Sequence, residues 1–135
     1  MFVIDTSVTM AWCFEDEAND ATEALLDRLH DEHAAVPAIW PLEVANVLLV
    51  AERRRRVSEA VVTRFVELLG QLPIQIDDAP TNMVEVIAAG RRHALSSYDG
   101  SYLVLAERLG VPLATLDQRL AAAARNAGVE LVVEP

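Results

Sequence analysis

Short apolar runs alternate with helix-length segments along the whole chain, and this pattern constrains the fold more than any other feature. The runs are almost wholly apolar rather than alternating, as expected of strands that helices cover on both faces. Helical segments of about ten residues or more between such strands are typical of βαβ units. We therefore predict an α/β fold with a central, mostly parallel sheet.

The predicted elements follow one another without a linker or a change of composition, so we expect a single domain over residues 1–135. Ser58 is the expected N-cap of the third helix, and Ser97 or Tyr98 that of the fifth. The expected strands are Phe2–Asp5, Ala34–Pro37, Pro73–Asp77, Val111–Thr115 and Val129–Val133. The expected helices are Asn19–Glu32, Pro41–Val57, Glu59–Gln71, Thr81–Leu95, Asp99–Leu109 and Gln118–Ala127.

Composition limits the possible cellular location of the chain and the kinds of surface that it exposes. A hydrophobic content of 53% is high for a net charge of −10, which indicates either an unusually full core or an apolar face that a partner covers. No apolar run is long enough for a membrane span, and the N-terminus lacks the basic start of a signal peptide. Because Cys13 is the only cysteine, we expect no disulfide and a cytoplasmic protein.

Positive charge is scarce and concentrated. The pI of about 4.6 argues weakly against a general nucleic-acid binder, because contacts to phosphates need lysine and arginine. Arg53–Arg56 and Arg91–Arg92 nevertheless form local basic runs. Arg53–Arg56 could contact phosphates, but the solvated end of an amphipathic helix is the favoured interpretation.

Acidic residues stand where apolar elements begin or end, although carboxylates are rarely buried unless they are paired or bound to a cation. Asp5 ends the first strand, Asp117 follows the fourth, and Glu43 lies near the start of an apolar helix. Ligands of parallel α/β sheets bind beyond the carboxyl ends of the strands, where these three acids are expected. Asp99 begins a helix that leads into a strand, so this rule does not place it.

Each acid has a structural explanation as well. Asp5 could cap a short helix through Thr6 and Ser7, Asp117 suits the N-cap of the helix from Gln118, and Asp99 suits interaction with a helix dipole. Glu43 is harder to explain because its neighbours are apolar. Neighbouring carboxylates also repel one another, by roughly 4 kcal/mol for two unit charges about 4 Å apart at an effective dielectric constant of about 20. Mg²⁺ or Mn²⁺ would remove this repulsion, and the scattered histidines do not favour zinc, so we predict a hard-metal site for hydrolysis.

The order and spacing of these motifs resemble those of the PIN-domain ribonucleases, and most closely of the VapC-type toxins of bacterial toxin–antitoxin pairs. The resemblance covers essentially the whole chain, and no single motif carries it. Gly100 stands where alanine is more usual, which weakens the start of a helix and leaves the acids intact. The matching segments are Val3–Ser7, Leu42–Asn46, Tyr98–Ala106 and Leu113–Asp117.

This resemblance implies a three-layer α/β/α sandwich and an endoribonuclease that depends on Mg²⁺ or Mn²⁺ and uses a metal-activated water. It implies that Asp5, Glu43, Asp99 and Asp117 are the catalytic and metal-binding acids. Asp5 and Asp99 are expected to coordinate the metal directly, and the other two to act partly through water. Transfer RNA and ribosomal RNA are both candidate substrates.

The same resemblance implies a cognate antitoxin that inhibits the enzyme, and a homodimer. The helix pair Pro41–Val57 and Ser58–Gln71 is the expected antitoxin groove, unless its apolar side chains only complete the core. Ser7, Asn46 and Thr115 are candidate supports for the acids, although capping or helix packing explains each of them equally well.

Two other functions stay open at this point. The segment Asp5-Thr6-Ser7 after a strand also fits the nucleophile motif of phosphatases of the haloacid dehalogenase type. Against this reading, Ser7 stands where a second aspartate is expected, and the basic residues are arginines rather than a motif lysine. A non-catalytic interaction module with the same fold is the third candidate, and the retention of all four acids argues against it.

Overall fold

The computed structural model describes residues 1–135 as five strands and seven helices. The strands form one sheet in the order β3-β2-β1-β4-β5, and every neighbouring pair is parallel. The prediction of a parallel sheet is therefore confirmed. The strands are β1 (Phe2–Ile4), β2 (Ala34–Val36), β3 (Ile74–Ile76), β4 (Leu113–Ala114) and β5 (Leu131–Val133).

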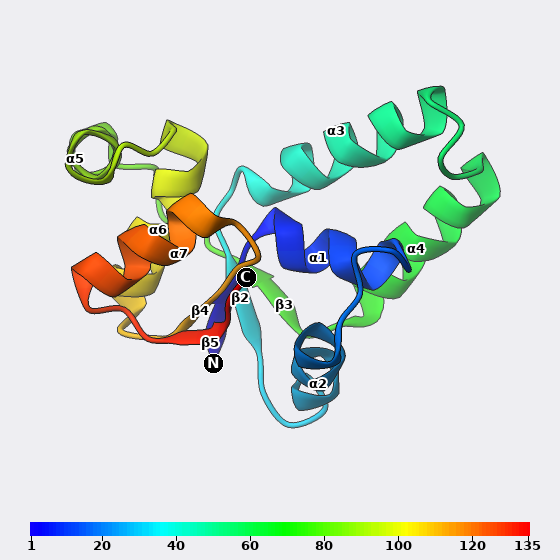
Figure 1. Cartoon of the computed structure of the whole chain (residues 1–135), viewed down its shortest axis with the longest axis horizontal. Coiled ribbons are helices and arrows are strands. Elements are labelled where there is room, and N and C mark those ends of the chain that lie inside the picture. Colours follow the sequence, from blue (N-terminus) through cyan, green and yellow to red (C-terminus); the bar gives the residue numbers. More distant parts are fainter.

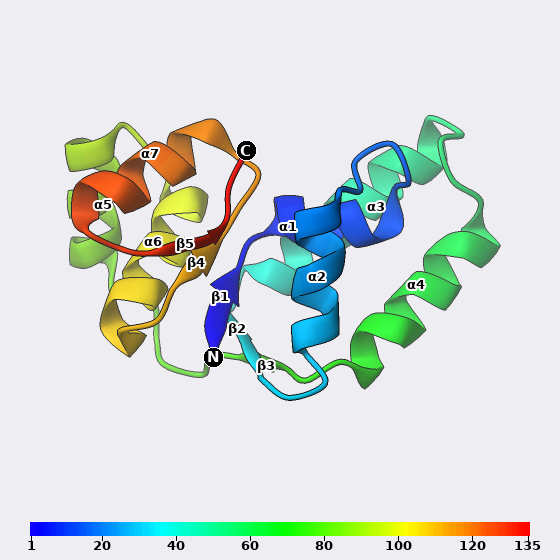
Figure 2. The same ribbon diagram turned by 60° about the horizontal axis from the view of Figure 1, so that its bottom comes forward.

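Helices cover both faces of this sheet and make three layers, as expected. Figure 2 shows α1–α4 grouped on one side of the sheet and α5–α7 on the other. The strand order explains this division, because the chain moves from β1 towards one edge and then from β3 back towards the other. Right-handed crossovers in opposite directions place their helices on opposite faces. The helices are α1 (Thr6–Cys13), α2 (Asp20–Arg28), α3 (Trp40–Arg53), α4 (Glu59–Gln71), α5 (Met83–His93), α6 (Ser97–Leu109) and α7 (Gln118–Ala127).

The structure corrects several details of the predicted elements. The list of expected helices lacks α1, although a short helix capped by Asp5 is one explanation of that acid. The central residues of α1, from Val8 to Ala11, are all buried, so no polar face marks it as a helix. Helix α3 ends at Arg53 instead of Val57, and the turn that follows contains Arg55 in the left-handed region at φ 58°. The expected cap of α6 at position 97 or 98 is wrong, because the Ser96 hydroxyl accepts the hydrogen bond that caps this helix.

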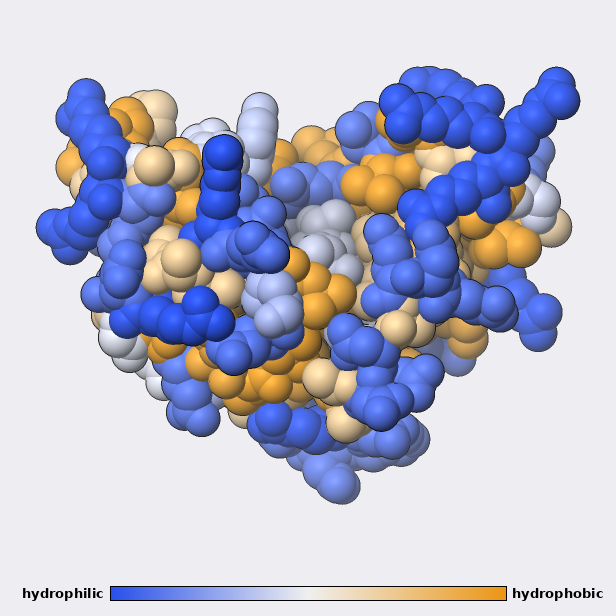
Figure 3. All heavy atoms as spheres, viewed as in Figure 1, coloured by the Kyte–Doolittle hydropathy of each residue, from blue (hydrophilic) through white to orange (hydrophobic).

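The hydrophobic residues divide between a core and an exposed surface. A cluster of 27 buried residues surrounds the sheet and includes all three residues of β1. Helices α3 and α4 form an arm that extends from this body (Figure 1). Apolar side chains are exposed on the arm among hydrophilic ones (Figure 3), and others are exposed on α5. They include Leu42, Leu49, Val61, Val66 and Leu68 on the arm and Met83, Val84 and Ile87 on α5.

The high hydrophobic content of the chain therefore corresponds to both a full core and exposed apolar side chains. None of the helices combines the length and the hydrophobicity that a membrane crossing requires.

Candidate active site

The four predicted acids belong to the starts of four helices, which converge beyond the carboxyl ends of the strands (Figure 1). Asp5 is the N-cap of α1, and Asp117 is the N-cap of α7. Glu43 and Asp99 lie in the first turns of α3 and α6. Strands β1 and β4 are neighbours whose connections leave towards opposite edges of the sheet, so the acids surround its switch point. This is the usual position of a ligand site in a parallel α/β fold.

Asp5 is held firmly by hydrogen bonds to both of its carboxylate oxygens. Its Oδ1 accepts hydrogen bonds from the Ser7 hydroxyl at 2.5 Å and from the Val8 N–H at 3.1 Å, and its Oδ2 accepts one from the Thr115 hydroxyl. The side chain is only 5% exposed. Burial raises the pKa of Asp5 to about 6, the hydrogen bonds oppose this rise, and the charge of Asp99 adds to it.

Two of the three predicted supporting residues contact the site. The Ser7 hydroxyl also accepts from the Leu116 N–H at 2.8 Å, and the Thr115 hydroxyl accepts from the Asp117 N–H at 3.0 Å. Both hydroxyls therefore join Asp5 to the segment after β4. Asn46, in contrast, is exposed one turn beyond Glu43 and makes no side-chain hydrogen bond to an acid.

Glu43 contacts two residues, Thr6 and Tyr102, that are not among the predicted site residues. The Tyr102 hydroxyl donates a hydrogen bond to its Oε1 at 2.5 Å, and the Thr6 hydroxyl donates to the same oxygen at 3.2 Å. Burial and the hydrogen bond to Glu43 raise the pKa of Tyr102, which keeps its hydroxyl protonated and able to donate. A signal was available in the sequence, because Thr6 adjoins Asp5 and Tyr102 lies three residues after Asp99 on one helix face.

Asp99 lies close enough to Asp117 and Glu43 for their charges to affect its pKa. Partial burial raises the pKa of Asp99, the negative charges of Asp117 and Glu43 raise it further, and Arg119 opposes them. None of the six ion pairs in the structure includes any of the four acids. The edge of the sheet therefore carries negative charge that no basic side chain neutralises by direct contact.

The chemistry of these donors fits a hard divalent cation. Carboxylate oxygens are the ligands that Mg²⁺ and Mn²⁺ prefer, and a cation would offset the uncompensated charge. The side chains are not drawn tightly together, since no group of three or more His, Cys, Asp or Glu could hold one ion. Mg²⁺ commonly uses one or two carboxylates and completes its shell with water and substrate oxygens. The arrangement of the four acids fits this partial coordination better than it fits a site in which the protein supplies every ligand.

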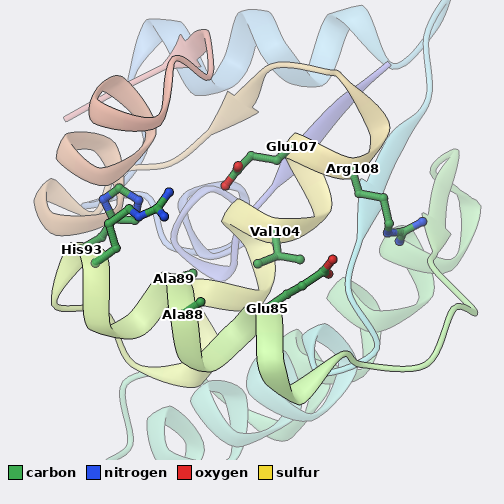
Figure 4. Close-up of a pocket in the computed structure, with 8 residues that line it drawn as sticks. Glu85, Ala88, Ala89, His93, Val104, Glu107 and Arg108 are labelled. Carbon is green, nitrogen blue, oxygen red and sulfur yellow. The ribbon is translucent and has the colours of Figure 1, made fainter.

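A separate cavity of about 390 Å³ lies between α5 and α6 and contains none of the four acids (Figure 4). Ala88 and Ala89 of α5 lie beside Val104 of α6, and the remaining lining side chains carry both signs of charge. Its Arg108 forms an ion pair with Asp77 outside the cavity. The mixed charge gives this cavity no clear ligand preference, so the site at the sheet edge is the better candidate.

The basic run at positions 53–56 lies at the C-terminal end of α3 and in the turn that follows it. The Arg56 guanidinium donates to Asp16 at 2.8 Å and lies 3.7 Å from the centre of the Phe14 ring, which attaches the arm to the loop after α1. Arg53, Arg54 and Arg55 are exposed at the end of α3. Arg56 thus has a structural role, and the rest of the run is solvated.

Known proteins are similar to this chain in sequence and in fold. A sequence model of the family described as PIN domain matches residues 2–126. Ribonuclease VapC12 of Mycobacterium tuberculosis is 32% identical to this chain, over 98% of this chain and 99% of the relative. Ribonuclease VapC3 of Pyrobaculum aerophilum is 27% identical, over 88% of this chain and 91% of the relative.

Two solved structures agree in fold. The crystal structure of PAE2754 from Pyrobaculum aerophilum matches with a TM-score of 0.74 at 25% identity, and the match covers 97% of this chain and 88% of that one. FitAcB from Neisseria gonorrhoeae matches with a TM-score of 0.66 at 20% identity, over 97% of this chain and 96% of that one. The resemblance seen in the sequence is confirmed, and the chain belongs to the PIN domain family.

Proposed function

We propose that this chain is an endoribonuclease that depends on Mg²⁺ or Mn²⁺ and hydrolyses RNA phosphodiesters at the carboxyl edge of its sheet. One observation carries the proposal: four acids from four helix starts share this edge, and no basic side chain pairs with any of them. The names of the relatives, which are ribonucleases, support the choice of RNA as substrate.

The acids divide the work in this proposal. Asp5 and Asp99 would hold the ion, and Glu43 and Asp117 would act through water molecules and orient the attacking water. A bound Mg²⁺ or Mn²⁺ supplies charge neutralisation at the phosphate and activation of the water. Ser7 and Thr115 keep the Asp5 carboxylate in one orientation through their hydrogen bonds. The Glu43 oxygen that Thr6 and Tyr102 do not contact is free to accept a hydrogen bond from the water.

Cleavage of a structured RNA tests this proposal directly. Purified chain, freed of any inhibitor, is incubated with transfer RNA or ribosomal RNA and Mg²⁺ or Mn²⁺, beside the variant Asp99→Asn. The proposal requires cleavage that stops with a chelator and that falls by about 100-fold or more in the variant, since loss of an outer-shell partner alone costs about 10–100-fold. Equal cleavage by both proteins would contradict it.

The family match does not favour the phosphatase alternative. The PIN domain model spans residues 2–126, and the relatives are named ribonucleases. The interaction-module alternative predicts no uptake of Mn²⁺ that depends on the acids. Calorimetric titration of the wild type and Asp99→Asn with Mn²⁺ therefore separates that alternative from the ribonuclease.

We propose further that a cognate antitoxin docks on the arm. A groove of about 320 Å³ lies between α3, α4 and β3, and most of its lining is apolar. Val66 lines this groove and is half exposed, so an apolar segment of a partner could bury it. Val66→Asp should weaken inhibition by the protein encoded beside this chain without changing RNA cleavage. Thr63→Asp, on the exposed face of the same helix, is the matched control.

A homodimer is the last part of the proposal. The exposed apolar side chains Met83, Val84 and Ile87 on α5 are available for such an interface. Light scattering of the purified chain should give about twice the monomer mass of 14.8 kDa, and a monomer at micromolar concentration would contradict the dimer.

A further inference from the structure

Three elements meet at a single carboxylate oxygen, the Oε1 atom of Glu43. Tyr102 of α6 donates to this oxygen at 2.5 Å, and Thr6 of α1 donates to it at 3.2 Å. The two hydroxyls are themselves 3.0 Å apart. A carboxylate only accepts hydrogen bonds, so the single hydrogen of the Tyr102 hydroxyl points at Glu43. The Thr6 hydroxyl also has one hydrogen, which the Glu43 Oε1 atom at 3.2 Å and the Tyr102 oxygen at 3.0 Å share. The three groups thus form a directed network rather than a chance contact.

Tyr102 is a rigid member of this network. Its side chain is 1% exposed and belongs to the buried cluster around the sheet. It stands three residues after Asp99 on the same helix face, so the hydroxyl that contacts Glu43 and the carboxylate of Asp99 move as one unit with α6. Thr6, in turn, directly follows Asp5 at the start of α1. The network therefore ties Glu43 of α3 to the two helices that carry Asp5 and Asp99.

We propose that Tyr102 is a positioning residue for the nuclease reaction, which with Thr6 fixes the Glu43 carboxylate relative to Asp5 and Asp99. A glutamate side chain has several rotamers, and the hydrogen bonds to Oε1 select one of them. They leave the second oxygen, Oε2, without a hydrogen-bond donor from the protein. Tyr102 itself contacts neither substrate nor ion in this account. The inference rests on the proposed function, because a positioned Glu43 matters only if the acids act on RNA.

Tyr102→Phe removes the hydroxyl and keeps the buried ring, and Tyr98→Phe is the matched control. Tyr98 is the only other tyrosine of the chain, lies on the same helix, is 56% exposed and has no part in the network. We measure kcat and KM for RNA, Mn²⁺ affinity by calorimetry without RNA, and thermal unfolding. Tyr102→Phe should lower kcat and Mn²⁺ affinity by about tenfold or more. KM and the unfolding temperature should stay close to those of Tyr98→Phe.

A double-mutant cycle separates positioning from a general structural role. If Tyr102 acts through Glu43, Tyr102→Phe should cost little more in a protein that already carries Glu43→Gln. Thr6→Val and Thr6→Ser give an independent test should Tyr102→Phe unfold more easily. The valine removes the second hydroxyl and should lower kcat, whereas the serine keeps it and should restore kcat.

The possible outcomes separate this inference from the proposed function. If the wild type cleaves RNA, Asp99→Asn does not, and Tyr102→Phe matches Tyr98→Phe in kcat and Mn²⁺ affinity, then the inference alone is overturned. The inference would also be overturned if Tyr102→Phe lowered kcat in the Glu43→Gln protein by the same factor as in the wild type. If the wild type neither binds Mn²⁺ nor cleaves RNA, the proposed function fails first and the inference fails with it.

Discussion

Asp5 and Thr115 are 110 positions apart in the chain, yet the Thr115 hydroxyl donates a hydrogen bond to Oδ2 of Asp5. The same hydroxyl accepts from the backbone N–H of Asp117. One buried oxygen atom therefore links the acid after β1 to the acid after β4 across the switch point of the sheet. Asp5 and Thr115 are both buried, so water cannot easily replace the hydrogen bond between them.

Thr115→Val should destabilise the fold through these two contacts. The substitution keeps the branched shape but leaves the Asp5 oxygen and the Asp117 N–H each without a buried partner. An unsatisfied buried group costs about 1–3 kcal/mol, so we expect the free energy of unfolding to fall by about 2 kcal/mol in urea denaturation. Thr63→Val, at an exposed position of α4, is the control and should change the free energy of unfolding by less than about 0.5 kcal/mol. Equal stability of the two variants would contradict the role given to Thr115.

The pKa of Asp5 predicts that the metal-free protein loses stability as pH rises from about 4 to above 6. Its pKa is raised by burial from an ordinary 3.8 to about 6, so the native state binds more protons than the unfolded state in this window. The contribution of Asp5 to the free energy of unfolding is fully present below about pH 4 and is lost as the pH rises through about 6. The shift corresponds to about 3 kcal/mol.

Asp5→Asn removes this group and should flatten the pH dependence of the free energy of unfolding. Asp78→Asn, at an exposed position, should leave the dependence as in the wild type. Urea denaturation in a chelator at a series of pH values between about 4 and 7.5 measures both variants. The interpretation of Asp5 fails if the asparagine variant keeps the full slope.

Asp99→Asn should change stability in opposite directions with and without metal. In a chelator the variant should melt at a higher temperature than the wild type, because the pKa of Asp99 is raised by burial and by the charges of Asp117 and Glu43. With Mn²⁺ at about 100 times its dissociation constant, the wild type should gain about 2.7 kcal/mol and the variant far less. Melting curves under both conditions test this crossing. A variant that is less stable under both conditions would show that Asp99 serves the fold rather than the site.

Much of the fold could be predicted because buried strands and amphipathic helices leave different patterns in a sequence. The five strands and most helices follow from apolar runs and periodicity. Helix α1 could not be predicted this way, since it is buried along its centre and has no polar stripe. The end of α3 depends on the left-handed turn at Arg55, where no glycine marks the change of direction.

The site was predictable to the extent that the sheet positions it. Asp5, Glu43 and Asp117 follow from the rule for parallel sheets, whereas the place of Asp99 came only from family resemblance. Tyr102 was missed because its role depends on how a hydroxyl on one helix meets a carboxylate on another. Its spacing from Asp99 indicates only that both residues share a face of α6, and not which carboxylate the hydroxyl contacts. Asn46 shows the converse, since it shares a helix with Glu43 but lies exposed.

The most direct test of a hydrolytic acid site is RNA cleavage in ¹⁸O-labelled water with Mn²⁺, analysed by mass spectrometry of the new RNA ends. Attack by water should place one labelled oxygen in the new terminal phosphate and leave no 2′,3′-cyclic phosphate. Asp99→Asn should give neither cleavage nor label. Products that end in an unlabelled cyclic phosphate, or cleavage by Asp99→Asn equal to that by the wild type, would contradict the account.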